Sequence, residues 1–133
     1  MVDVQIRSDS RYPVDRRRLR QLIERLLVAQ GITSEVVVSV VVVGKRQMQE
    51  LNATYHGVEA ATDVLSFPYV DAQSSRDHGQ FATPKEERNV LGDMAICYPV
   101  AVEQAREQGK LVDEEIDFLV AHGLDHLLGK HHE

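Results

Sequence analysis

The chain has 133 residues, 43% of them hydrophobic, a net charge of −6 at pH 7 and a single cysteine. This length and apolar fraction suit one globular domain with a packed core, and the single cysteine excludes an internal disulfide. The charge argues against non-specific nucleic-acid binding but is uneven: residues 1–56 carry a net +3 and residues 57–133 a net −9. The two parts either face different partners or differ only in their solvated helix faces.

No stretch of the sequence has the pattern of a secretory signal or a membrane span. The opening residues MVDVQIRSDSRYP lack a charged segment followed by an apolar one. The longest apolar run, VVVSVVVV, is far too short to cross a bilayer. We therefore expect a single cytoplasmic domain over residues 1–133, with no membrane partner.

The first part of the chain predicts two strands, each followed by a helix. Residues 2–6 alternate in polarity as in a strand, and residues 14–29 repeat apolar side chains at helical spacing. Residues 35–43 are β-branched and apolar, which is typical of a strand buried on both faces. Residues 45–55 predict a short helix. The outer face of the first helix carries Arg16, Arg17, Arg20 and Arg25.

The second part predicts two strands and then two helices. Residues 64–68 form a brief strand, residues 69–89 a long polar surface loop, and residues 89–97 another strand. A helix then runs from Pro99 to Gly109, and the last helix starts at Asp113. The order β-α-β-α-β-β-α-α predicts an α+β fold: one mixed sheet with its helices mainly on one side.

Four of the six histidines lie in the last twelve residues. His122 and His126 are four residues apart, so they stack one turn above the other at the edge of an apolar helix stripe. Gly129 predicts a helix stop, after which His131 or His132 can turn back toward them. A histidine pair alone is more often incidental. A third histidine after a glycine stop favours an open zinc site with three nitrogen ligands.

The residue after the first histidine argues against a peptidase. Peptidases with the H-E-x-x-H motif place a general base there, but this chain has Gly123. The single cysteine, Cys97, falls in a predicted strand and is expected to be a small core residue rather than a ligand.

Three separated motifs resemble those of the YbeY family, bacterial rRNA maturation factors described as metal-dependent endoribonucleases. HGLDHLLGKHH resembles the family pattern H-G-x-L-H-L-x-G-Y-D-H. LNATYHGVEAATDVLSFP is similar to L-N-x-x-Y-R-G-x-x-x-x-T-D-V-L-S-F-P, and LGDMAIC to L-G-D-I-x-I. The motifs occur in the expected order and cover residues from about 51 to 132.

The resemblance implies a substrate, a metal and a ligand set. The family's three ligands fall on His122, His126 and His132, which would hold one Zn²⁺ per chain. The implied activity is single-strand-specific, metal-dependent endoribonuclease cleavage in ribosomal RNA processing, including 16S rRNA maturation, and in ribosome quality control. The implied partners are ribosomal RNA and the small ribosomal subunit. Either water or the RNA's own 2′-hydroxyl could attack the phosphorus.

The second motif contains the remaining candidate catalytic residues, His56, Asp63 and Ser66. The family has an arginine at the position of His56, where a permanently charged group would contact phosphate. Thr62, Asp63 and Ser66 either line the cleft or cap local turns. The sequence also departs from the family at Lys130 and His131, and the family usually continues with an acidic tail after the last ligand, whereas this sequence ends at Glu133.

Because the family arginine is replaced, a second interpretation remains open. It is a ribosome-assembly or RNA-binding factor with a structural zinc and weak or no nuclease activity. On either interpretation the phosphate backbone of RNA needs positive charge for binding. The candidates for that contact are Arg16, Arg17, Arg20, Lys45 and Arg46.

Overall fold

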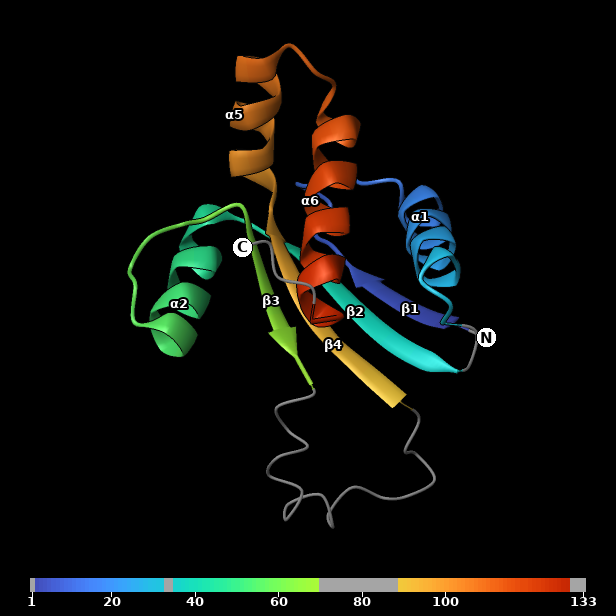
Figure 1. The fold of residues 1–133 in the computed structure, drawn as a ribbon. Helices are drawn as coiled ribbons and strands as arrows, with labels where there is room; N and C mark the ends of the chain where they lie inside the picture. Colours follow the sequence, from blue (N-terminus) through green and yellow to red (C-terminus); the bar gives the residue numbers. More distant parts are fainter. Residues whose placement is uncertain (1, 33–34, 70–88, 130–133) are drawn as a thin grey trace.

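The described part of the chain folds into one four-stranded mixed sheet with four helices (Figure 1). The computed structural model describes residues 2–32, 35–69 and 89–129. The elements are β1 (Val2–Arg7), α1 (Arg16–Ala29), β2 (Val36–Val43), α2 (Lys45–His56), β3 (Val64–Pro68), β4 (Asn89–Cys97), α5 (Tyr98–Gln108) and α6 (Val112–Leu127). Their order is the predicted one. The long loop predicted after β3 lies almost wholly outside the described residues.

The strands lie in the order β1-β2-β4-β3, so β3 forms an edge of the sheet. β1, β2 and β4 run parallel, whereas β3 pairs antiparallel with β4. Gly92 in β4 has a φ of 146°, and a Cβ there would lie 2.5 Å from the backbone oxygen of Phe67. Only glycine adopts this conformation without strain, so Gly92 allows β3 to approach β4 closely.

The two faces of the sheet are covered unequally. α1 and α6 lie side by side over one face and bury the larger cluster, whose members include Val4, Leu19, Ile23, Val38, Met94, Ile96, Ile116 and Leu124. α2 packs on the opposite face, and α5 continues from β4 and packs against α6 (Figure 1). The expectation of helices mainly on one side therefore holds for α1 and α6 but not for α2.

Among the described residues, the second face is buried mainly beside α2. There a smaller cluster forms from Val43, Met48, Leu65, Ala95 and Cys97. Farther back along β2, Ser39 and Val41 on this face are only partly buried. The prediction that β2 is covered on both faces thus holds at its carboxyl end and fails along its first part.

α6 ends where the sequence predicts. Leu128 caps the helix, and Gly129 takes the left-handed conformation with a φ of 79°. Acidic residues occupy the first turn of α6, where they favour the positive end of the helix dipole. Within the described ranges, no helix combines the length and apolar character needed to cross a bilayer.

Candidate functional site

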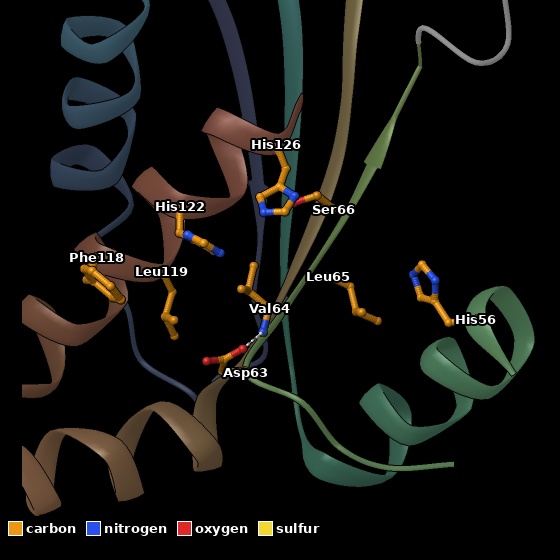
Figure 2. A pocket seen from close by; sticks show the side chains of 9 residues that line it. All are labelled: His56, Asp63, Val64, Leu65, Ser66, Phe118, Leu119, His122 and His126. Carbon is orange, nitrogen blue, oxygen red and sulfur yellow. Dashed lines mark hydrogen bonds between the residues drawn. The ribbon is translucent and has the colours of Figure 1, made fainter. Parts of the chain in front are cut away.

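A pocket of about 340 Å³ lies beside α6 at the edge strand β3 (Figure 2). Its walls are formed by His56, Asp63, Val64, Leu65, Ser66, Phe118, Leu119, His122 and His126. The structure thus brings together five of the six residues that the sequence singled out. The sixth, His132, lies outside the described residues.

His122 and His126 extend from successive turns of α6 toward β3 (Figure 2). Their ring centroids are 4.8 Å apart and the ring planes are inclined by 59°. His122 is half-buried and His126 is exposed. Within the described ranges no group of three metal-ligating side chains occurs, so the described structure contains two of the three expected ligands.

Phe118 is a pocket residue that the sequence reasoning missed. It lies one turn before His122 and stacks on its ring, with centroids 6.4 Å apart and planes 14° apart. Its side chain is 58% exposed. An aromatic residue four positions before the first histidine was the available signal, because residues at that spacing share a helix face. Phe118 thus places an aromatic ring beside His122 in the wall of the pocket.

Gly123 allows α6 to lie directly on the sheet. A Cβ at this position would come within 2.9 Å of Met94 Sδ and 3.1 Å of Ser66 Oγ. The hydroxyl of Ser66 donates a hydrogen bond of 3.1 Å to the carbonyl oxygen of Gly123. A glutamate side chain therefore has no room at this position, which strengthens the argument against an H-E-x-x-H peptidase.

Asp63 lines the pocket and also forms hydrogen bonds that connect the start of β3 with α5 and β4. Its Oδ1 accepts a hydrogen bond of 2.7 Å from the Val64 amide, and its Oδ2 accepts one of 3.2 Å from Gln104 Nε2 on α5. Its carbonyl oxygen accepts from the Cys97 amide at 2.9 Å. The hydroxyl of Thr62 donates to Oδ1 at 3.4 Å. The sequence left open whether Asp63 lines the cleft or caps a local turn, and in the structure it does both.

His56 reaches the pocket from α2, across β3 from the histidine pair (Figure 2). Its ring stacks on Phe67 with centroids 6.2 Å apart and planes 16° apart. The turn that follows is held by Asn52, a buried residue whose Nδ2 donates 3.0 Å to the carbonyl oxygen of Ala60. Asn52 is a second residue that the sequence reasoning missed.

The basic residues proposed for RNA contact do not line this pocket. Arg16 and Arg17 are exposed on α1, and α1 packs beside α6 over β1 (Figure 1). The Arg16 guanidinium donates to the carbonyl and hydroxyl oxygens of Ser8. Lys45 bonds Glu103 at 2.7 Å, and this hydrogen bond raises the pKa of Lys45. Its charge is therefore partly compensated within the protein.

Comparisons with known proteins identify the same relatives along nearly the whole chain. The sequence model of the family described as Endoribonuclease YbeY matches residues 4–133. An Endoribonuclease YbeY of Roseiflexus sp. strain RS-1 is 37% identical over 132 residues, covering 99% of this chain and 79% of the relative. That of Moorella thermoacetica is 39% identical over 115 residues, covering 86% and 72%.

The fold is also similar to a solved structure. The solution structure of TM1509 from Thermotoga maritima superimposes with a TM-score of 0.61 at 26% sequence identity. The match covers 98% of this chain and 75% of that protein. The resemblance inferred from three sequence motifs is therefore confirmed over the whole domain.

Proposed function

Because the chain belongs to the endoribonuclease YbeY family, we propose that it is a zinc-dependent endoribonuclease that cleaves single-stranded RNA. The observation that carries this proposal is the histidine pair of α6, whose rings lie 4.8 Å apart in a pocket at the sheet edge. Neighbouring imidazoles on successive helix turns suit a shared metal ion, and imidazole nitrogen is a preferred zinc ligand. His132 is the proposed third ligand.

The metal and the protein would divide the chemistry between them. When bound, zinc supplies Lewis acidity, which lowers the pKa of a bound water and polarises a phosphoryl oxygen. Phe118 and Ser66 fix the positions of His122 and of α6 through the stacking and hydrogen-bond contacts described above. His56 lines the same pocket from the other side of β3, and we assign it the contact with a phosphate oxygen.

The substrate follows from the family rather than from the pocket alone. We propose ribosomal RNA as the substrate, with roles in 16S rRNA maturation and ribosome quality control, and the small ribosomal subunit as a partner. A cytoplasmic location accords with this substrate. Because β3 is the edge strand, an unpaired RNA strand could cross it without a duplex having to enter the pocket.

One observation favours the binding-factor alternative. His56 offers a single imidazole where the family has a guanidinium, so transition-state charge near the phosphate would be less well stabilised. In this alternative the metal has a structural role and RNA or ribosomal partners are bound without turnover.

Metal analysis combined with an RNA cleavage assay tests the proposal. We expect about one zinc ion per chain and cleavage of single-stranded RNA that stops with chelator and returns with zinc. His126→Ala should lose both metal and cleavage, whereas Glu107→Ala, an exposed change on α5, should lose neither. Failure to take up zinc would overturn the proposal. Zinc uptake and RNA binding without cleavage would support the binding-factor alternative.

A further inference from the structure

A second pocket, of about 380 Å³, lies on the sheet face opposite α1 and α6. Strands β1, β2, β4 and β3 form its floor and α2 forms one wall. It is lined by Arg7, Ser39, Val40, Val41, Leu51, Tyr55, Phe67, Pro68, Tyr69, Asp93, Met94 and Ala95. This is the part of the sheet that α2 leaves uncovered, and no residue in it belongs to the histidine pocket.

The strand register orders the polar and apolar side chains of this floor. Ser39 lies opposite Asp93, which in turn lies opposite Phe67, so these three form one row across β2, β4 and β3. In a parallel row on the same face, Arg7 lies opposite Val41. The floor therefore carries a hydroxyl and a carboxylate on its two central strands, with the Arg7 guanidinium on β1 and apolar side chains beside them.

Aromatic rings form the side of the pocket nearest the sheet edge. The rings of Tyr55 and Phe67 have centroids 5.0 Å apart. Tyr69 directly follows the last residue of β3 and lines the same pocket as Phe67. Tyr55 is 62% exposed and Tyr69 is 51% exposed. Exposed rings beside groups that donate and accept hydrogen bonds are the combination that binds an unstacked nucleobase.

The two pockets adjoin each other through Phe67. Its ring contacts Tyr55 in this pocket and stacks on His56, which lines the histidine pocket. Tyr55 and His56 are consecutive residues at the end of α2. An extended strand crossing β3 would thus place one nucleotide in each pocket.

We propose that the pocket between Tyr55 and Asp93 is a nucleobase subsite that holds a base of the RNA strand next to the cleaved phosphodiester. This inference rests on the proposed function. The ring of Tyr55 stacks on the base, and the Asp93 carboxylate accepts a hydrogen bond from an exocyclic amino group. Arg7 donates to a base oxygen or to the adjoining phosphate. The carboxylate favours cytosine over uracil, because uracil has a carbonyl oxygen where cytosine has an amino group.

Binding of short single strands to the metal-free protein in chelator tests the subsite without cleavage. The probes are fluorescent cytidylate and uridylate octamers and an abasic strand of the same length, measured by anisotropy. We expect Tyr55→Leu to weaken cytidylate binding by about tenfold, as loss of one stacked base does, and to leave abasic binding unchanged. Tyr55→Phe keeps the ring and should bind like wild type.

Asp93→Asn tests the hydrogen bond separately. Wild-type protein should prefer cytidylate over uridylate by about tenfold, and the preference should shrink in Asp93→Asn but not in Glu107→Gln. Equal binding of abasic and base-bearing strands, or unchanged cytidylate binding by Tyr55→Leu, would overturn the subsite. A protein that binds bases in this way but never cleaves RNA would instead overturn the proposed function and leave the base-binding pocket standing.

Discussion

His56 stands at the position where the motif resemblance implies a family arginine. It is fixed by stacking on Phe67 rather than by a charged partner among the described residues. A guanidinium carries a permanent charge and offers a rigid fork of donors, whereas His56 offers a single imidazole. His56 lines the histidine pocket, and its proposed contact with phosphate would be weaker than that of an arginine.

Replacing His56 with arginine should increase catalysis. A permanent charge stabilises negative charge that develops on the phosphate in the transition state, so kcat should rise more than KM changes. We expect His56→Arg to raise kcat on the order of tenfold, and His56→Ala to lower it only slightly. The measurement is kcat and KM on a single-stranded RNA at pH 7 with excess zinc.

The comparison requires equal metal content in the three variants, verified by metal analysis. An arginine variant that binds zinc normally but cleaves no faster than wild type would show that this position does not face the scissile phosphate. The binding-factor alternative would then gain support.

At the scale of the elements, α1 presents its arginines to solvent on the far side of α6 from the histidine pocket. Arg18 differs from its neighbours, because it pairs with Asp117 at 2.5 Å and Asp113 at 3.5 Å on α6. Arg18 thus connects two helices, whereas Arg16, Arg17 and Arg20 remain the candidates on α1 for a contact with phosphate.

Removing these three arginines together should weaken RNA binding without affecting metal. Each phosphate contact adds about 0.7 to the slope of log affinity against log salt for single strands. The triple variant with alanine at Arg16, Arg17 and Arg20 should therefore have a slope smaller by about 2. The measurement is anisotropy of a labelled single strand from low to moderate salt. Arg106→Ala, an exposed cation on α5, is the matched control. Unchanged binding at low salt would mean that α1 carries only a solvated face.

The elements themselves were predictable because each has a clear local signal. Apolar spacing marked α1, β-branched runs marked β2, and Gly109 and Gly129 take the left-handed conformation at the predicted helix ends. The side on which α2 packs was not predictable. Met48 gives α2 an apolar face, but nothing local says which face of the sheet receives it, because that depends on the order β1-β2-β4-β3.

The candidate site, too, was predictable where its residues share one helix and not where they come together through the sheet. His122 and His126 could be paired from their spacing because both lie on one helix. His56 joins them only because β3 lies at the sheet edge between α2 and α6 (Figure 2). The second pocket, with Tyr55 beside Phe67, depends on that long-range pairing as well and has no local sequence signal.

For the whole molecule, the basic first part and the acidic second part partly compensate each other. Arg18 bonds Asp117, and Lys45 bonds Glu103, so both ion pairs join the two parts of the chain. Burial raises the pKa of Asp117 even though Arg18 opposes the shift. Because the pKa of Asp117 is higher in the folded than in the unfolded protein, its ionised carboxylate lowers the free energy of unfolding at neutral pH. This cost disappears as the pH falls below the ordinary carboxyl value.

Cys97 lies in the smaller of the two buried clusters, and we expect its labelling to report the opening of the entire fold. Cys97 is fully buried beneath α2, and burial raises the pKa of its thiol. The native thiol is therefore both inaccessible and uncharged, while alkylation requires an exposed thiolate. We expect iodoacetamide at pH 8 to label Cys97 only through unfolding. The labelling rate should increase with urea along the slope of global unfolding.

A distant core change separates global from local opening. Ile23 is fully buried on α1, across the sheet from Cys97. Ile23→Val should cost about 1 kcal/mol, and so raise the labelling rate about fivefold. N-acetylcysteine labelled in the same urea series controls for the reagent. If Ile23→Val destabilises the protein but leaves the rate unchanged, α2 opens alone. The wall of the second pocket would then be less stable than the sheet it covers, because labelling through a local opening does not depend on contacts across the sheet.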